Sequence, residues 1–314
     1  MSREVAPLSR ARPFINAGPP TSGVNGTGFG EVRPKDLLFD TTNGVLFKNE
    51  GTLASPYYVP VNQDDSALFG VHTDFRDGVG KPTANTDTQA FLAGSGLRIF
   101  GQGMAETDSG LVVQAAGEGG QGLGRMTTTN EDLHVLAIGM AAGVMQPDQH
   151  QLLVVDVILT MVSAITLRSF FVGFMGLAAS ALNTVVNGSG TTATFSTTGN
   201  EGDDLVGLFQ DVGLSDVDAL FGVHNKSNAG ANQDLSSDGD TGPTNIAAAG
   251  TEQRFRVELD AAANVTMFVD KVEVYTQAIA LDVDEECSPV VYVASTSTAV
   301  KSMDVRRFSA YAYR

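Results

Sequence analysis

The feature that most constrains the fold is an alternation of apolar and charged residues near the carboxyl end of the chain. Phe255, Val257 and Leu259 alternate with charged neighbours, and the chain then turns through residues 260–264 into a second apolar run over residues 265–275. A period of two places every second side chain on one face of a strand, whereas a helix repeats about every 3.6 residues. This segment therefore predicts a β-meander with a buried face.

Composition agrees with an all-β chain. The 314 residues include 35 glycines, with abundant Ser, Thr, Asn and Asp in the connections, which suits many turns and few helices. A chain of this length buries enough surface to hold a core without disulfides or metals. The single cysteine, Cys287, cannot form an internal disulfide, and we expect it to be a packed, unreactive thiol.

Short runs rich in β-branched and aromatic residues predict strands along the rest of the chain. The predicted strands cover residues 97–100, 111–115, 133–138, 205–209, 219–224, 290–294 and 300–313. In the last of these the apolar positions change parity at Arg306 and Arg307, which predicts a β-bulge. The apolar stretch 152–182 is divided by Asp156 and Arg168, so it predicts two buried strands instead of a membrane span.

The amino-terminal part differs in character from the rest. Residues 1–30 hold several prolines and glycines and a net charge of +2, which predicts an extended arm. Two alternatives stay open for this arm: an unattached leader, or a strap that binds the acidic body of its own chain or of a neighbour. Residues 31–66 contain Asn43-Gly44 between apolar runs, a strong hairpin signal, and residues 57–59 could add a third strand.

The net charge of −17 argues against nucleic-acid binding, because affinity for phosphates comes from Lys and Arg. An acidic surface keeps a protein soluble and suits a basic partner. The string Ala-Leu-Phe-Gly-Val-His occurs at residues 67–72 and again at 219–224, by chance or by a weak duplication.

No motif of a known catalytic class is present, so we expect no enzymatic activity. The four histidines are dispersed, and the glycine-rich residues 117–124 lack the lysine of a P-loop. Acidic pairs, such as those in residues 282–286, supply at most part of a calcium site, and solvated turns are the simpler explanation of them. We therefore expect no cofactor, with a structural calcium ion as the alternative.

The closing strands resemble a known family. The run Phe-Arg-Val-Glu-Leu-Asp-Ala-Ala-Ala-Asn-Val-Thr-Met-Phe-Val-Asp-Lys at residues 255–271 is similar to hairpins in concanavalin A-like jelly rolls of tailed-bacteriophage virion proteins. Ala263 and Lys271 stand where the family has glycine, which predicts altered turns at both places. Residues 38–52, Leu-Phe-Asp-Thr-Thr-Asn-Gly-Val-Leu-Phe-Lys-Asn-Glu-Gly-Thr, resemble hairpins of phage structural proteins.

The resemblance implies an antiparallel jelly-roll sandwich over residues 67–314, following the arm (1–30) and the hairpin element (31–66). It further implies a non-enzymatic capsid decoration (cement) protein on the outer capsid surface of the virion. Such a protein would bind the major capsid protein lattice and would form a homo-oligomer, expected to be a trimer, with no nucleic-acid or membrane partner. The expected contact residues lie in the arm and hairpin: Arg3, Arg10, Arg12, Phe14, Phe39, Phe47, Tyr57 and Tyr58.

One alternative function stays open at this point. The same fold could serve as a carbohydrate-binding module of a head fibre or tail fibre that recognises a host glycan. Sugars usually stack on exposed aromatic side chains, and the chain has no Trp and only six Tyr. A long fibre would also be expected to carry a coiled-coil or repetitive stalk, and the sequence has neither.

Overall fold

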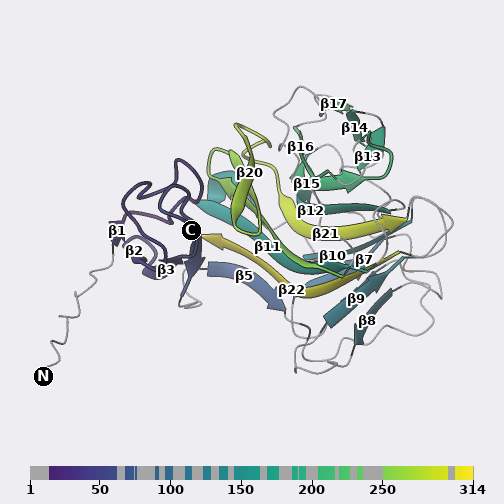
Figure 1. Cartoon of the computed structure of the whole chain (residues 1–314), viewed down its shortest axis with the longest axis horizontal. Helices are drawn as coiled ribbons and strands as arrows, with labels where there is room; N and C mark the ends of the chain where they lie inside the picture. Colours follow the sequence, from purple (N-terminus) through teal and green to yellow (C-terminus); the bar gives the residue numbers. More distant parts are fainter. Residues whose placement is uncertain are drawn as a thin grey trace, which may run out of the picture. The chain divides into compact units, whose positions relative to one another are not determined.

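The computed structural model shows a chain of two compact units, Met1–Leu68 and Phe69–Arg314, which are described separately below (Figure 1). All structural statements concern the residues that the structure describes. These are residues 14–61, 68–73, 75, 89–91, 96–101, 110–114, 123–128, 134–140, 145–162, 168–176, 186–189, 191–195, 204–215, 219–226, 232–235, 250–295 and 301–313.

The amino-terminal unit contains one four-stranded sheet with the strand order β1-β2-β3-β4. Its strands are β1 (Phe14–Asn16), β2 (Leu37–Asp40), β3 (Val45–Asn49) and β4 (Tyr58–Pro60). The β2-β3 hairpin and the third strand β4 are antiparallel, as the sequence predicts. Strand β1 was not predicted, and it pairs in parallel with β2.

The turn between β2 and β3 differs from the expected two-residue turn. Asp40 pairs with Val45 across a four-residue connection, and only Gly44 in that connection has a positive φ, at 69°. The buried Asp40 carboxylate explains the difference, because its Oδ1 accepts hydrogen bonds from the N–H groups of Thr42 and Asn43. This side chain holds the backbone in an Asx turn, so Asn43 does not need a left-handed conformation.

Residues 17–32 do not form a separate arm. The N–H of Gly23 donates to the carbonyl of Pro56 at 2.8 Å, and the N–H of Gly30 donates to the carbonyl of Leu53 at 2.9 Å. The boundary expected at residue 30 is therefore not seen, and the described residues 14–30 belong to the same unit as the hairpin. Residues 1–13 lie outside the described part of the chain.

The carboxy-terminal unit is built from two large sheets and one small sheet. The eight-stranded sheet has the order β20-β19-β18-β11-β22-β9-β8, with β5 also paired to β22. Its strands are β5 (Leu68–Thr73), β8 (Gly110–Gln114), β9 (Leu123–Thr127), β11 (Leu152–Met161), β18 (Glu252–Asp260), β19 (Val265–Val269), β20 (Val272–Gln277) and β22 (Ser302–Tyr313).

The seven-stranded sheet has the order β16-β15-β12-β21-β10-β7-β6. Its strands are β6 (Gln89–Phe91), β7 (Leu97–Phe100), β10 (Val135–Met140), β12 (Arg168–Gly176), β15 (Leu205–Asp211), β16 (Phe221–Asn225) and β21 (Cys287–Ser295). The small sheet contains β13 (Val186–Ser189), β14 (Thr192–Phe195) and β17 (Asn232–Asp234). The single helical turn among the described residues is the 3-10 helix η2 (Pro147–Gln149).

The two large sheets pack face to face, as Figure 1 shows, and enclose the main core. Alternate residues of each strand point into this core, including Val155 and Val157 from β11, Phe255 and Val257 from β18, and Val172 from β12. From β9 to β12, and again from β20 to β22, the chain crosses between the sheets at each connection. This is the wrapping of a jelly roll, so the predicted antiparallel jelly-roll sandwich is confirmed.

The small sheet gives the seven-stranded sheet a second, separate core on its outer face. Val186 and Phe195 from the small sheet pack with Phe171, Phe209 and Tyr292. The Phe171 and Tyr292 rings stack at 5.5 Å between centroids. The seven-stranded sheet is therefore apolar on both faces, as the nearly continuous apolar runs of β12, β15 and β21 require.

The strand register confirms two predictions of detail. Ile158 pairs with Arg307 while Leu159 pairs with Val305, so Arg306 is the extra residue of a bulge. The apolar stretch that begins at Leu152 forms strands β11 and β12. Within the described ranges there is no helix that is both long and apolar enough to cross a membrane.

Candidate functional site

The structure separates the predicted partner-contact residues into two groups. Phe14 is 36% exposed and Phe39 is half-buried, so both can contact a partner. Phe47, Tyr57 and Tyr58 are buried, with at most 1% of their surface exposed, so they are not available to a partner in this structure. The prediction that these three side chains contact a partner therefore requires correction. Arg3, Arg10 and Arg12 lie outside the described residues.

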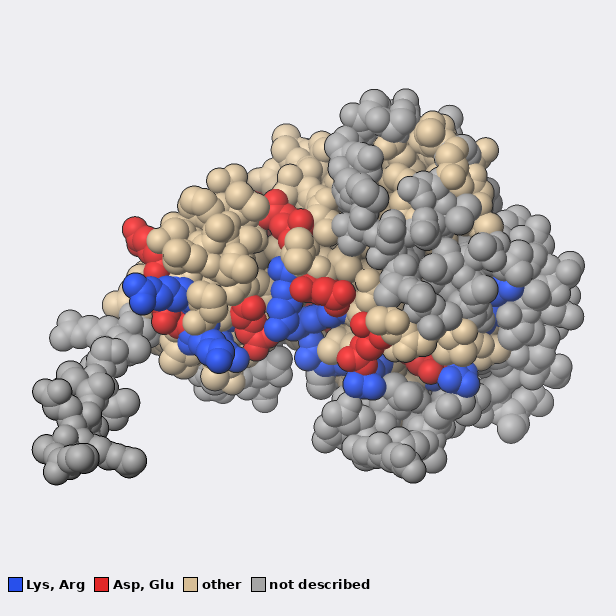
Figure 2. Space-filling model, viewed as in Figure 1, with Lys and Arg blue, Asp and Glu red and all other residues tan. Residues whose placement is uncertain are grey.

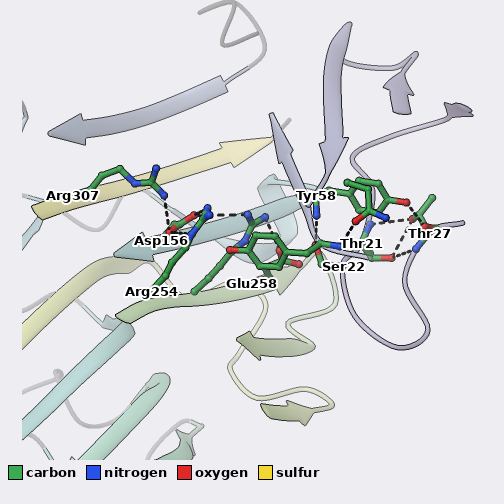
Figure 3. Close-up of polar contacts among 11 residues, drawn as sticks. Thr21, Ser22, Thr27, Tyr58, Asp156, Arg254, Glu258 and Arg307 are labelled. Carbon is green, nitrogen blue, oxygen red and sulfur yellow. Dashed lines mark hydrogen bonds and ion pairs between the residues drawn. The ribbon is translucent and has the colours of Figure 1, made fainter. Parts of the chain in front are cut away.

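Tyr58 and Asn49 hold the amino-terminal unit together from inside. The Tyr58 hydroxyl donates to the carbonyl of Thr27 at 2.6 Å, and the Tyr58 N–H donates to the Ser22 hydroxyl (Figure 3). Burial, helped by the negative charge of Asp36, raises the pKa of Tyr58 to about 12. Asn49 donates from Nδ2 to the carbonyl of Val32 at 2.9 Å. The polar groups of Tyr58 and Asn49 therefore stabilise the fold of the amino-terminal unit.

The other face of the amino-terminal sheet is apolar and only partly covered. By strand alternation and register, the side chains on this face are Ile15, Leu37, Phe39, Leu46, Lys48 and Val59. None of them is buried, and Ile15 is 76% exposed. The opposite face carries the buried Leu38, Val45 and Phe47. We call the first set the open face.

Sequence reasoning found one residue of the open face, Phe39, and missed the other five. Residues 37–39 and 45–47 are unbroken apolar runs, so alternation alone does not say which parity is buried. The signal available in the sequence was that odd and even positions of these runs are both apolar, so side chains on both faces of the sheet are apolar. A small sheet with two apolar faces needs a cover on each of them.

Charged residues form a second notable group, on the outer face of the eight-stranded sheet. Asp156 of β11 lies between Arg254 of β18 and Arg307 of β22 (Figure 3). Arg254 donates to both carboxylate oxygens of Asp156, and Nη2 of Arg307 donates to Oδ1 at 3.1 Å. Next along β18, Nη2 of Arg256 lies 2.6 Å from Oε1 of Glu258. We call these five residues the ionic network.

The electrostatics of this network make its acids poor catalysts. Burial raises the pKa of Asp156, but the hydrogen bonds from Arg254 and the charges of Arg254, Arg256 and Arg307 outweigh that effect, so the pKa is lowered. A general acid needs a carboxyl group that keeps its proton near neutral pH. Asp156 is also 2% exposed and Glu258 is 3% exposed. The network is suited to stabilising the pairing of strands β11, β18 and β22.

Two further ion pairs extend this charged face toward water. Arg125 donates to both oxygens of Asp304, at 2.7 and 2.8 Å, and Arg306 lies 2.7 Å from Glu252. Figure 2 shows Lys and Arg atoms next to Asp and Glu atoms in a band across the lower half of the view. The described arginines of this face are each paired with a carboxylate, so the face offers little unbalanced charge to a ligand.

Among the residues whose side chains the structure describes, no aromatic platform for sugar stacking is seen in the carboxy-terminal unit. All six tyrosines of the chain are buried, the most exposed being Tyr311 at 7%. Burial, modulated by the surrounding charges, raises the pKa of Tyr311 to about 12. Among described phenylalanines, Phe14 and Phe29 are exposed, and both belong to the amino-terminal unit.

Acidic residues at one end of the sandwich remain without a metal-site geometry. In the part of the chain that the structure describes, no group of three or more His, Cys, Asp or Glu side chains could hold a metal ion. Asp282 pairs with Lys226 at 3.0 Å, and burial together with neighbouring carboxylates raises the pKa of Glu285. Cys287 is buried, and burial raises its thiol pKa, as expected for an unreactive packed thiol.

Comparison with known proteins supplies no family. No family model and no curated protein matches the sequence. Among solved structures, the chain is similar to the Emp47p carbohydrate recognition domain (12% identity, TM-score 0.45, 80% of this chain and 99% of that chain). It is also similar to peanut lectin (13%, 0.44, 78% and 97%) and to a glycoside hydrolase family 16 endo-glucanase from Bacteroides ovatus (10%, 0.41, 80% and 97%). Lectins and an enzyme occur together here, so the likeness leaves the activity of this chain open.

Proposed function

We propose that this chain is a non-enzymatic structural protein of a tailed-bacteriophage virion, a capsid decoration protein that stabilises the shell. In this proposal the amino-terminal unit binds the major capsid protein lattice, and the acidic jelly roll is the outward body. The observation that carries the proposal is the open face, where five apolar side chains and Lys48 share one side of a small sheet.

Charge distribution supports the assignment of the contact to this unit. Residues 1–68 carry a net charge of −1, whereas residues 69–314 carry −16 of the −17 for the whole chain. Hydrophobic contact needs surfaces that can be desolvated at low cost, and charges raise that cost. The near-neutral unit is therefore the better contact surface, and the acidic body is better suited to solvent.

Two observations weigh against the other functions considered. The carboxylates of the ionic network are neutralised by guanidinium groups, which disfavours acid–base catalysis. All tyrosines are buried and tryptophan is absent, which disfavours a sugar-stacking site. Resemblance of the closing strands and of the β2-β3 hairpin to phage virion proteins supplies the viral context.

The proposal is tested by binding purified chain to capsids that lack it. Phe39→Asp places a charge on the open face, and we expect at least a tenfold weaker binding, or about 1.4 kcal/mol. Val272→Asp is the matched control, because Val272 is 64% exposed and lies on β20 of the other unit. It should leave occupancy unchanged.

Equal binding by the Phe39→Asp variant and the unmodified chain would remove the open face from the proposal. A thermal melt of both variants checks that each remains folded. If the chain instead binds no capsid and retains a host glycan, the carbohydrate-binding alternative is the better account.

A further inference from the structure

We propose that β1 is an exchangeable strand, which leaves its own sheet and pairs with β2 of a neighbouring copy of this chain. The proposal goes beyond the function above, because it assigns a self-association device that can be measured without any capsid. It concerns the backbone pairing of β1 with β2, whereas the proposed capsid contact concerns the side chains of the open face, to which β1 contributes Ile15.

Strand β1 is weakly held by its own sheet. Among the described residues it has three residues and lies at the edge of the sheet, where β2 is its one partner strand. Ile15 is 76% exposed, so its side chain would lose little buried surface if β1 left, and Phe14 is already 36% exposed. An unpaired strand edge carrying apolar side chains is a template for pairing with another chain.

The chain that follows β1 has the features of a hinge. Gly18 has a φ of 99°, and Pro19 and Pro20 come next. Proline has no N–H to donate and holds the backbone extended, so this pair cannot join the sheet. Beyond the prolines, the N–H of Gly23 donates to the carbonyl of Pro56, which anchors the rest of the unit. The movable part is therefore residues 14–18.

Exchange preserves every bond that β1 makes. In the chain, the N–H of Thr41 donates to the carbonyl of Asn16 at 2.8 Å, and the N–H of Gly18 donates to Oδ1 of Asp40 at 3.0 Å. A second copy of β1 offers the same Asn16 carbonyl to the Thr41 N–H and the same Gly18 N–H to the Asp40 carboxylate. Domain swapping has a low energetic cost for this reason.

A second copy of this chain carries the one segment already shown to fit β2, and charge makes the amino-terminal unit the less costly place of contact. Two bodies of net charge −16 repel each other, whereas the amino-terminal units carry −1 each. The segment Phe14-Ile15-Asn16 is uncharged and already complementary to β2, with Phe14 paired to Leu38 and Ile15 paired to Phe39.

The test uses the register partners Ile15 and Phe39 in the full-length chain. Two single variants, I15C and F39C, are refolded together, oxidised and run on a non-reducing gel. Neither chain can form this disulfide internally, and the native Cys287 is buried. We expect a covalent dimer in the mixture that is absent from either variant alone.

The matched control is the double variant L37C/K48C, whose positions are partners on β2 and β3. It should form its disulfide within one chain. The double variant I15C/F39C should form covalent species of two or more chains, and the number of chains gives the symmetry of the assembly.

Disulfides within single chains only, or a monomeric mass of the unmodified chain in light scattering at tens of micromolar, would overturn the exchange. Equal capsid binding by Phe39→Asp and the unmodified chain would contradict the proposed capsid contact but not the exchange, so the two proposals fail separately.

Discussion

At the scale of single residues, Asp156 is the centre of the ionic network. It is 2% exposed and accepts hydrogen bonds from Arg254 and Arg307. Replacing it by Ala leaves a largely buried guanidinium without its carboxylate, so we expect Asp156→Ala to lower the free energy of unfolding by about 3–5 kcal/mol. Urea denaturation measures this change.

A control for that change is Glu252→Gln, which breaks the pair between Arg306 and Glu252. Both side chains are about two-fifths exposed, so solvent screens the pair and we expect a loss below about 1 kcal/mol. If Asp156→Ala and Glu252→Gln lower the free energy of unfolding by the same amount, the ionic network does not stabilise the sheet as proposed.

Asp156 also gives stability a pH dependence of known sign. Its folded pKa lies below the ordinary value of 3.8, so the unfolded chain takes up the proton first as the pH falls. The stabilisation is fully present above that ordinary value and is lost as the pH falls through the folded pKa. Between pH 5 and pH 2 the free energy of unfolding, measured by urea denaturation, should therefore change less with pH for Asp156→Asn than for the unmodified chain. The same pH dependence in both proteins would contradict this.

At the scale of elements, the β19-β20 hairpin has a turn whose backbone conformation its residues do not favour. Val269 pairs with Val272, so Asp270 and Lys271 form a two-residue turn, and both have positive φ. Lys271 adopts the left-handed conformation that glycine tolerates best.

Lys271→Gly should relieve this strain and raise the free energy of unfolding by about 1 kcal/mol. Ala263→Gly is the informative comparison, because Ala263 also has a positive φ, at 57°, but its methyl group is fully buried in the main core. The lost burial offsets the relief there, so we expect almost no gain. A fall in melting temperature for Lys271→Gly would contradict the account.

The strands show which elements a sequence can predict. Alternation placed β18 and β19, and the parity change at Arg306 placed the bulge, because each signal lies within a few consecutive residues. Strand β1 gave no such signal: three residues of it are described, and twenty residues lie between its end and the start of its partner β2. A short parallel partner is set by tertiary pairing and not by local pattern.

The candidate contacts were predicted only in part for a related reason. Phe39 and Phe47 both come from apolar runs of the same hairpin, yet the register turns Phe39 toward the open face and Phe47 inward. The inward parity is fixed by partners such as Asn49 and Tyr58, whose polar groups bond to Val32 and Thr27. Those contacts span 17 and 31 residues, beyond the reach of a sequence pattern.

At the scale of the whole molecule, the two units divide the properties of the chain between them. The carboxy-terminal unit holds the jelly-roll core and a charge of −16, and the amino-terminal unit holds the open face and the edge strand β1 with a charge of −1. A body that repels its copies and a unit that attracts a partner suit a protein that covers a surface without aggregating.

The copy number of this chain in purified virions tests that account most directly. Quantitative mass spectrometry against the major capsid protein gives it in one measurement. We expect a fixed, high stoichiometry, with copies in the hundreds or a simple fraction of the capsid protein, and retention in heads after tails are removed. A handful of copies per particle, purifying with tails, would contradict the account.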